Sequence, residues 1–447
     1  MKTLLAAALT LTLALASTAH AAGWQQVTAS GGANIDEVST VRTPDGVLHV
    51  AWHKDGDLFH TAIAANGKVG ASTPIQSAWA GVEDPAIVAV PGGLRAFWGG
   101  IRTVEAGEPN QDLNTAFSAD GGASWQLQIG TIIPTGAQSY ASDVSATTLP
   151  NGSTLQSWFG TLGTWVHAGL DPAAPSHDFQ TAGSYGYDPG IASAANGAAT
   201  LAWFSNANAL PGVLAQGVAA DGSPTGPQLR MPGSQVMLGG GTLARTPVVS
   251  RAGNGGFYVA YGLGYPTANQ ARVWRVGAAK TTLLDTTDAN TKMTLAPAAD
   301  GRLWVVWTDG TFGTQRVLAA RSNEQASAWG QPVDLGHAKA ANQVYAVDAN
   351  ATPAGLDVLA LFGIGTTSGG STFVTRVQPG LTLKAKRSDH GATFTVTDAG
   401  DPVKGAKVKL AGKSGKTDKK GRVTLDARKG TATASADGYE DAKLKLK

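Results

Sequence analysis

The sequence predicts an all-β protein, on three observations. Glycine accounts for 58 of the 447 residues, and only 15% of the residues are charged. Long helices need periodic blocks of Ala, Leu, Glu and Lys, but here Gly, Thr, Ser and Asn interrupt the alanine-rich stretches. A glycine-containing turn followed by a short apolar stretch recurs along most of the chain. That pattern is typical of strands joined by tight turns.

The first residues predict export from the cell. Lys2 precedes an apolar run over residues 4–15, and Ala19-His20-Ala21 forms a small-residue cleavage site, as in a secretory signal peptide over residues 1–21. The run is shorter than the ~20 residues that span a bilayer, so we expect a secreted protein without a membrane span. Because the chain has no cysteine, core burial rather than disulfides must hold it together. The high Ala and Gly content indicates a bacterial source.

Charge divides the chain near residue 380. Residues 380–447 carry a net charge of +8, and residues 1–379 carry −6, although the whole chain carries only +2. Such an asymmetry marks a domain boundary. We therefore expect an acidic domain over residues 22–379 and a small basic domain over residues 380–447.

One unit recurs seven times in the acidic domain. A turn ending in glycine precedes an apolar strand that carries an aromatic residue, as in PDGVLHVAW, which ends at Trp52. The glycine lets the backbone take a positive φ between two strands. The turn glycines are Gly46, Gly93, Gly152, Gly197, Gly255, Gly301 and Gly355. The strand positions that follow are Trp52, Trp98, Trp158, Trp203, Tyr261, Trp307 and Leu361. The regular placement of these tryptophans predicts packing between units rather than contact with a ligand.

Each unit divides into four short strands, which is the pattern of a β-propeller blade. Seven units predict a seven-bladed β-propeller. The seventh unit ends after its third strand, whereas Trp24 in GWQQVTAS matches Trp125 and Trp329, each of which begins a fourth strand. We therefore expect the N-terminal strand to complete the last blade and close the ring, which would remove exposed sheet edges.

The segment SADGGASW lies between the third and fourth strands of the second unit. Its Ser118, Asp120, Gly122 and Trp125 match the Asp-box S-x-D-x-G-x-x-W, so residues 22–379 resemble the sialidase-like (Asp-box, or BNR) β-propeller superfamily. The resemblance implies a structural hairpin on the face away from the ligand. There the Asp would accept hydrogen bonds from turn amides, and the Trp would fill the gap under the loop.

A second segment, SNEQASAW over residues 322–329, keeps the Ser-to-Trp spacing. It has Glu324 and Ala326 where the box has Asp and Gly, so it resembles a decayed copy. The sialidase motif Arg-Ile-Pro does not occur in the chain. No catalytic residue is therefore carried over from the resemblance.

A column of carboxylates marks the expected ligand face, where the first strand of each blade begins beside the axis. It lies nine residues before each turn glycine and reads Glu37, Asp84, Asp143, Asp188, Thr246, Lys292 and Ala346. These carboxylates either cap the first strands by accepting hydrogen bonds from nearby amides or converge on an axial pocket. Convergence would raise their pKa values. Two carboxyl groups ~5–9 Å apart suit glycoside hydrolysis, and oxygen ligands suit Ca²⁺.

Side chains near this column are compatible with a sugar ligand. Aromatic rings precede several first strands, and basic or aromatic residues such as His53, Arg102 and Tyr265 follow the second strands. The ligand-binding residues we predict are Glu37, Asp84, Asp143, Asp188, Lys292, Arg102, Trp79, Tyr140 and Tyr187.

The basic domain carries three further motifs. They are Pro402-Val403-x-Gly405-Ala406-x-Val408, the hairpin KTDKKGRVTL over residues 416–425, and ADGY over residues 436–439. This order resembles the carboxypeptidase regulatory-like domain, a small prealbumin-like β-sandwich. Alternation in AKVKL and AKLKLK predicts strands with one apolar and one lysine-lined face. The lysines either protect sheet edges or dock on anionic cell-envelope polymers. No aromatic-basic platform for nucleic acid is present.

These observations predict a monomer that recognises an extracellular ligand, with a glycan favoured. One alternative is a glycoside hydrolase that uses two of Asp84, Asp143 and Asp188. The other is a protein-interaction scaffold. No cofactor is expected other than Ca²⁺, and neither nucleic acid nor a membrane is expected as a partner.

Overall fold

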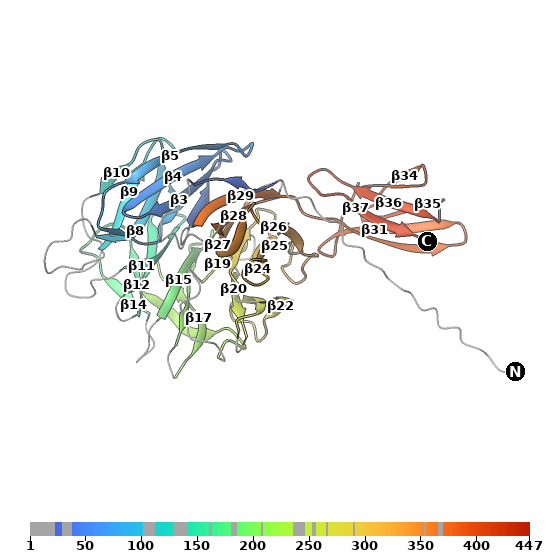
Figure 1. Ribbon diagram of the computed structural model, residues 1–447. Coiled ribbons are helices and arrows are strands. Elements are labelled where there is room, and N and C mark those ends of the chain that lie inside the picture. Colours follow the sequence, from blue (N-terminus) through green and yellow to red (C-terminus); the bar gives the residue numbers. More distant parts are fainter. Residues whose placement is uncertain are drawn as a thin grey trace. The chain divides into compact units, whose positions relative to one another are not determined.

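The computed structural model describes residues 23–28, 38–101, 112–128, 141–160, 163–179, 186–206, 209–235, 246–252, 256–264, 267–288, 291–352, 355–364 and 370–447. These residues form strands and turns and contain no helix, so the all-β prediction is confirmed. They divide into two compact units (Figure 1). We call the unit that ends at Val377 the body and the unit from Gln378 to Lys447 the C-terminal unit.

The predicted signal peptide lies outside the described residues. In the part of the chain that is described, no helix is long and apolar enough to cross a bilayer.

The described residues of the body form seven antiparallel sheets that follow one another along the chain. The first three sheets contain β2 (Val38–Arg42), β3 (Leu48–Lys54), β4 (Asp57–Ile63) and β5 (Val69–Gln76); β6 (Gly81–Val82), β7 (Ala86–Val90), β8 (Gly93–Ile101), β9 (Asp112–Ser118) and β10 (Gln126–Gln128); and β11 (Ser142–Thr148), β12 (Thr154–Gly160), β13 (Gly163–Ala168) and β14 (Ser176–Asp178).

The other four sheets contain β15 (Gly186–Ser193), β16 (Ala199–Ser205), β17 (Gly212–Val218) and β18 (Pro224–Arg230); β19 (Val248–Ser250), β20 (Phe257–Leu263), β21 (Gln270–Arg275) and β22 (Thr282–Thr286); β23 (Met293–Pro297), β24 (Leu303–Asp309), β25 (Arg316–Arg321) and β26 (Val333–Gly336); and β27 (Ala341–Thr352), β28 (Gly355–Ile364), β29 (Gly370–Val377) and β1 (Gln25–Gln26).

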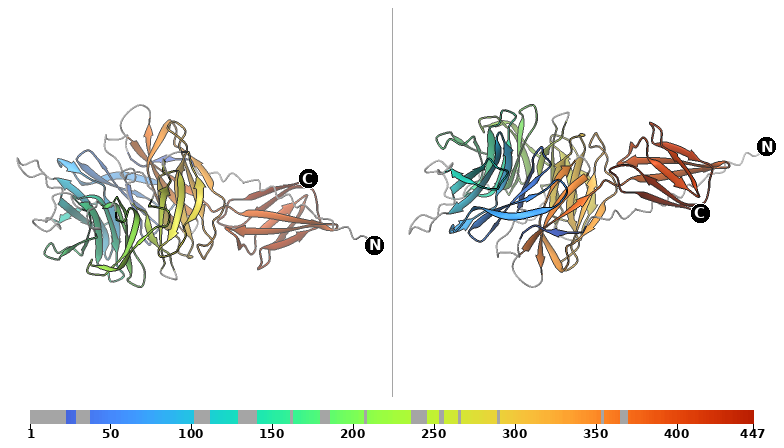
Figure 2. Two further views of the ribbon diagram at one scale, coloured as in Figure 1. Left: turned by 90° about the horizontal axis from the view of Figure 1, so that it is seen from below. Right: turned by 90° about the horizontal axis from the view of Figure 1, so that it is seen from above.

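Neighbouring sheets touch through the strands that begin each repeat. Contacts run from β2 to β7, β11, β15, β19, β23 and β27 in turn, and β27 also contacts β2. In Figures 1 and 2 the blue strands of the first sheet and the orange strands of the last sheet lie side by side. This cyclic order of contacts between mostly four-stranded sheets is consistent with a propeller.

The N-terminal strand joins the sheet formed by the last repeat. Gln25 lies opposite Val374, and Gln26 lies opposite Phe373, so β1 becomes the fourth strand beside β29. Trp24 Nε1 donates a hydrogen bond to the Leu335 carbonyl at 2.9 Å. The two ends of the body's chain therefore meet in one sheet.

A buried carboxylate ties this last sheet to the first. Asp357 in β28 is 2% exposed and accepts hydrogen bonds from Arg42 in β2 and from Arg376 in β29. The Arg376 fork contacts both carboxylate oxygens, at 2.6 and 2.8 Å. Arg42 Nη1 also donates to the Gly46 carbonyl at 2.7 Å, and Arg376 Nη1 donates to the Ala65 carbonyl at 2.8 Å. Charge-assisted, forked contacts of this kind are strong and directional.

The tryptophans of the repeat are core residues. Each is at most 2% exposed: Trp52, Trp98, Trp158, Trp203 and Trp307. Trp52 in β3, for example, packs in one cluster with Leu361 of β28 and Val374 of β29. The prediction that this column packs between repeats is confirmed.

Four of the seven predicted turn glycines are confirmed. Gly46, Gly152, Gly197 and Gly301 have φ between 83° and 87°. The prediction for Gly93 is wrong, because Gly92 takes the positive φ of 84° while Gly93 begins β8. A Cβ at Gly93 would lie 2.0 Å from the Ser118 carbonyl oxygen, so a close strand approach explains that glycine instead. Gly255 lies outside the described residues, and Gly355 is the first residue of β28.

The SADGGASW segment forms a closed turn between β9 and β10. Ser118 Oγ donates to Asp120 Oδ1 and accepts from the Gly122 amide, both at 2.8 Å. Ser124 donates to the same carboxylate from its amide at 2.9 Å and from its hydroxyl at 2.6 Å. The hydrogen bonds from Ser124 and Ser118 lower the pKa of Asp120 to about 2. Gly122 has φ 91°, as a tight turn at this position requires.

This turn rests on a buried histidine pair of the first sheet. His49 Nδ1 and His60 Nε2 are 2.9 Å apart, and the Trp125 ring meets the His60 ring edge-on at 5.6 Å. Burial lowers the pKa of both histidines, that of His60 to about 4. A Cβ at Gly122 would lie 2.1 Å from the His60 ring, so this glycine lets the turn close over a neutral imidazole.

The second box-like segment uses a different residue for the same task. Asn323 Oδ1 accepts from the Ser327 amide at 2.8 Å and from the Ala328 amide at 3.1 Å. Ala326 takes a left-handed φ of 50° where the box has glycine. The sequence pattern aligned Glu324 with the Asp of the box, but the capping oxygen comes from Asn323, one residue earlier.

The C-terminal unit contains two sheets around one apolar cluster that includes Phe394 and Val408. One sheet contains β30 (Thr382–Ser388), β31 (Gly391–Asp398), β32 (Asp401–Pro402) and β35 (Arg422–Leu425). The other has the order β34 (Lys413–Lys416), β33 (Lys407–Leu410), β36 (Gly430–Ser435) and β37 (Ala442–Leu446).

We predict that Asp357→Asn destabilises the body strongly. The substitution removes the negative charge between two partly buried guanidinium groups, and breaking such a buried pair costs about 3–5 kcal/mol. Urea unfolding should show this loss, while the matched control Asp334→Asn, whose ion pair with Arg316 is exposed, should change stability by less than about 1 kcal/mol. Equal unfolding midpoints for the two variants would contradict a role for Asp357 in joining the first and last sheets.

Candidate functional site

A cavity of about 270 Å³ lies where the first strands of the repeats meet. β2, β7, β11, β15, β19, β23 and β27 all contribute to its lining, as do Thr246 and Lys292, which precede β19 and β23. A second cavity of about 950 Å³ borders the opposite ends of five of these strands, at Arg42, Ser193, Ser250, Pro297 and Asn350. The predicted column therefore lies at the starting ends of strands that share one internal space.

Two of the predicted carboxylates lie on β-bulges. The pairing of β11 with β12 shifts between Ser142 and Ser145, and that of β15 with β16 shifts between Tyr187 and Gly190. Asp143 and Asp188 occupy these shifts, with left-handed φ values of 50° and 53°. Bulges re-aim side chains and are frequent beside functional sites, and such φ values in non-glycine residues are strained.

Asp188 is held at its position by a close approach of two segments. The Thr246 amide donates to the Asp188 carbonyl at 2.7 Å. A Cβ at Gly190 would lie 2.1 Å from the Thr246 carbonyl oxygen, so glycine is needed for this contact. The result is that the Asp188 side chain is only 5% exposed.

This burial changes the acidity of Asp188. The pKa of its carboxyl group is raised to about 7, mainly by burial; the Lys292 ammonium lowers this pKa, and the Asp84 carboxylate raises it. Three members of the predicted column, Asp84, Asp188 and Lys292, are therefore close enough to interact electrostatically. At neutral pH Asp188 exchanges between a neutral and an ionised form, as a group that gives or takes protons requires.

Two neighbouring groups complete this cluster. His53 at the end of β3 places Nε2 3.5 Å from Asp84 Oδ1, and both side chains are buried. Tyr261 in β20 is 3% exposed, and burial together with Asp188 raises the pKa of its hydroxyl well above the usual value. We call Asp84, Asp188, Thr246, Tyr261 and Lys292, with His53, the axial cluster.

Some polar atoms of the axial cluster lack hydrogen-bond partners. Within the described residues these are Asp188 Oδ2, Thr246 Oγ1 and both ring nitrogens of His53. Thr246 is fully buried and lines the cavity. Buried polar groups are normally satisfied, so each exception requires an explanation such as a bound water or ligand. The strand-capping hypothesis does not supply a partner for Asp188 Oδ2.

The predicted aromatic residues are packed against protein. The Trp79 ring is half-buried and lies 5.5 Å from that of Trp98. The Tyr187 ring lies between those of Phe159, at 5.0 Å, and Phe204, at 6.4 Å. These rings support the walls of the site, and their contact with a ligand stays a prediction.

Several other predicted residues lie outside the described residues: Glu37, Arg102, Tyr140 and Tyr265. Asp143 is described and half-buried. The charges that shift the pKa of Asp188 come from Lys292 and Asp84 rather than from Asp143.

The sequence analysis named Tyr261 only as a packing position of the repeat and did not name Phe312. Tyr261 is the one tyrosine in a column otherwise filled by tryptophan and leucine, which was a usable signal. Phe312, in the loop from β24 to β25, is 71% exposed. That loop is fixed because Gly313 donates from its amide to the Asn342 carbonyl at 2.6 Å. The glycines on either side of Phe312 in DGTFGT indicate an exposed turn, which is a weaker signal.

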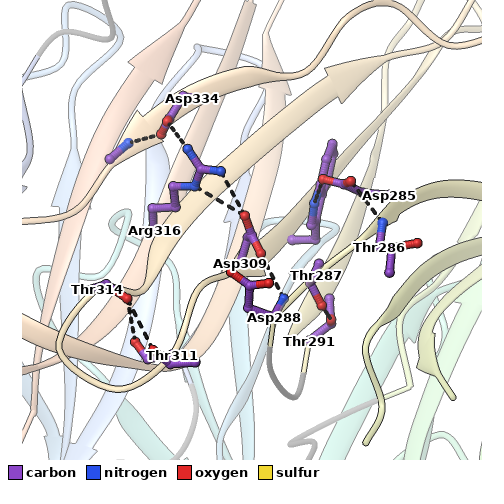
Figure 3. A network of polar contacts seen from close by, with 12 residues as sticks. Asp285, Thr286, Thr287, Asp288, Thr291, Asp309, Thr311, Thr314, Arg316 and Asp334 are labelled. Carbon is purple, nitrogen blue, oxygen red and sulfur yellow. Dashed lines mark hydrogen bonds and ion pairs between the residues drawn. The ribbon is translucent and has the colours of Figure 1, made fainter. Parts of the chain in front are cut away.

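Not every carboxylate near these loops resembles Asp188. Arg316 lies between Asp309 and Asp334, at 2.8 and 2.7 Å, and Asp309 also accepts from the Asp288 amide at 3.1 Å (Figure 3). Although burial acts in the opposite direction, the hydrogen bond from Arg316 lowers the pKa of Asp309. Both carboxylates have Arg316 as an ion-pair partner, whereas Asp188 Oδ2 has no hydrogen-bond partner.

No group of three or more His, Asp or Glu side chains gathers at metal-binding distances within the described ranges. The Ca²⁺ hypothesis therefore has no complete ligand set there and stays a prediction.

Comparison with known proteins bears on the fold. No protein-family model matches the sequence, and no curated protein matches it. Among solved structures, the chain is similar to a polysaccharide lyase PL25, an ulvan lyase, bound to a GlcA-containing saccharide. The TM-score is 0.53 at 11% identity, over 78% of this chain and 95% of the lyase. A second structure of a PL25 ulvan lyase has a TM-score of 0.50 at 10% identity, over 80% and 95%. At such identities the likeness shows a shared fold.

We predict that Asp188 makes the body less stable as the pH rises. Because its folded-state pKa is raised, the stability it contributes is complete below the unfolded value near 4 and is lost as the pH rises through about 7. Relative to wild type, Asp188→Asn should therefore gain about 3 kcal/mol of unfolding free energy between about pH 5 and about pH 8. Urea titrations at several pH values measure this difference. If the two proteins gave parallel curves, Asp188 would have an ordinary pKa.

Proposed function

We propose that the body is a closed, seven-bladed β-propeller of the sialidase-like type, completed by its N-terminal strand. Seven sheets, the return contact from β27 to β2, and the pairing of β1 with β29 support this arrangement. The contacts of Asp120 within SADGGASW are those expected of an Asp-box hairpin. The C-terminal unit is proposed to be a prealbumin-like sandwich.

The function that the geometry supports best is glycan recognition at the axial cluster. The observation that carries it is Asp188, a buried carboxyl group with a raised pKa and an unpartnered oxygen, beside the unpartnered hydroxyl of Thr246. Sugar hydroxyl groups both donate and accept hydrogen bonds, so they match a carboxyl group that can do either. Two members of the axial cluster, Thr246 and Lys292, line the cavity of about 270 Å³, and small ligands prefer such concave settings. The solved structures of similar fold include a polysaccharide lyase bound to a saccharide.

A second candidate is cleavage of a glycosidic bond at the same cluster. Glycosidases pair a protonated carboxylic acid with a second carboxylate that acts as base or nucleophile. Burial keeps Asp188 partly protonated at neutral pH, so it could donate a proton to the leaving oxygen, with Asp84 as the second group. A protein-binding scaffold has less support, because it needs no buried acid.

The setting of this function is proposed from the sequence. The N-terminal pattern over residues 1–21 supports secretion, and the substrate would then be an extracellular or cell-envelope glycan. We propose that the protein acts as a monomer, and Ca²⁺ bound by the column of carboxylates stays a proposal.

A binding and release assay tests both candidates. Wild type, Asp188→Asn, Thr246→Val and the control Asp334→Asn would be titrated with a panel of neutral and acidic oligosaccharides, and released reducing ends would be measured in parallel. We expect at least one oligosaccharide to bind at least tenfold more weakly to both axial variants, because each loses one buried polar contact, while the control binds as wild type does.

Release of sugar that is lost in Asp188→Asn would establish the enzyme. Binding without release would support recognition alone. Equal binding by all four proteins, or none, would refute the axial site.

A further inference from the structure

One sheet of the C-terminal unit has an exposed face built largely of lysines. In the sheet β34-β33-β36-β37, side chains alternate between the core and solvent. Val408, Leu410, Ala432 and Ala434 point inward and are at most 1% exposed. The outward positions include the exposed residues Lys407, Lys409, Lys416, Lys443 and Lys445, which we call the lysine face.

The strand register sets the spacing of these charges. Lys407 pairs directly with Lys416, and the row beside it runs from Lys409 through Thr433 to Lys443. Strands lie ~4.8 Å apart, and successive residues on one face of a strand lie ~6.7 Å apart. Neighbouring lysines therefore leave the sheet ~5–10 Å apart, which is comparable to the Debye length of about 8 Å at physiological ionic strength.

The strands of this sheet carry no charge that balances the lysines. The four strands contain no acidic residue, and within the described residues none of the five lysines forms an ion pair. Like charges directly opposite one another destabilise a sheet. The lysine face therefore weakens the unit that carries it, unless an anion binds there.

Edge protection explains only part of the face. Lysines guard a sheet when they lie on its edge strands, which here are β34 and β37. Lys407 and Lys409 lie on β33, which is paired on both sides. Lysines that served only solubility could lie anywhere on the surface, whereas these five lie on one face of one sheet.

We propose that the lysine face binds a linear anionic polysaccharide, whose carboxylate or sulfate groups repeat along the chain. Ser414, Thr431, Thr433 and Ser435 lie between the lysines on the same rows and offer hydroxyl groups to the sugar. Several phosphate-like or carboxylate contacts release counterions together, so the affinity falls steeply with salt.

Other polyanions fit this face less well. The four strands contain no aromatic residue on which a nucleic-acid base could stack. The large apolar side chains that are exposed within the described residues are Leu127, Leu283 and Phe312, all in the body, so the unit has no apolar anchor for a lipid bilayer. The proposal is independent of the axial site, because it involves other residues in another unit.

The test uses the full chain and four probes: polygalacturonate, dextran sulfate, neutral dextran and a DNA duplex at equal charge concentration. The variant is K407Q/K409Q/K443Q/K445Q. The control K384Q/K386Q/K419Q/K420Q removes the same charge from β30 and from the turn before β35. We expect wild type to bind one or both anionic polysaccharides and not to bind neutral dextran. It should bind DNA at least tenfold more weakly than the anionic polysaccharide.

The face variant should lose at least tenfold in affinity for the anionic polysaccharide and most of the salt dependence, and the control less than threefold. Its melting temperature should be unchanged or higher, because repulsion is relieved. Equal losses in the two variants, or equal binding of DNA and polysaccharide, would reduce the effect to net charge and overturn the proposal, as would no binding at all. The face variant K407Q/K409Q/K443Q/K445Q should bind the neutral oligosaccharides used to test the axial cluster as wild type does, because none of these lysines belongs to that cluster.

Discussion

The close approach of seven first strands around one cavity is the constraint on which the body depends. At one point of this ring the backbones approach so closely that only glycine fits, as Gly190 shows against the Thr246 carbonyl oxygen. The ends of these strands are therefore crowded, and a polar group placed there loses water. Asp188 has a raised pKa for this reason, so the packing that assembles the sheets also creates the chemistry of the axial cluster.

Such an arrangement must also be held together where the chain begins and ends. Asp357 between Arg42 and Arg376 joins the first sheet to the last, and β1 adds a backbone ladder to the same sheet. Since the chain has no cysteine, these polar contacts take the place that a disulfide could have in an exported protein. Their burial matters in the proposed secreted setting, because exposed ion pairs are screened by salt and contribute little stability.

The repeat in the sequence predicted much of this structure, because it is periodic and each copy places the same position at the same point of a sheet. That is why Asp84, Asp188 and Lys292 could be grouped from spacing alone. Spacing does not show what surrounds a side chain: Tyr187 packs between Phe159 and Phe204 from other strands. It also does not show bulges, nor that Asn323 rather than its neighbour would cap a turn. The packing of Tyr187 depends on contacts between strands, whereas the Asn323 cap is a local contact at a position that the box pattern leaves open.

The two proposed sites bind sugars by different physics. The axial cluster uses a few buried groups and an acid with a raised pKa, whereas the lysine face uses exposed charges and counterion release.

Hydrogen–deuterium exchange of the full chain, with and without the tightest-binding oligosaccharide, tests most directly the central claim that the axial cluster binds a glycan. The account predicts slower exchange in peptides covering residues 84–90, 186–193, 246–250 and 292–297. Protection confined to outer strands such as β5 and β18, with no change at the axial cluster, would contradict it.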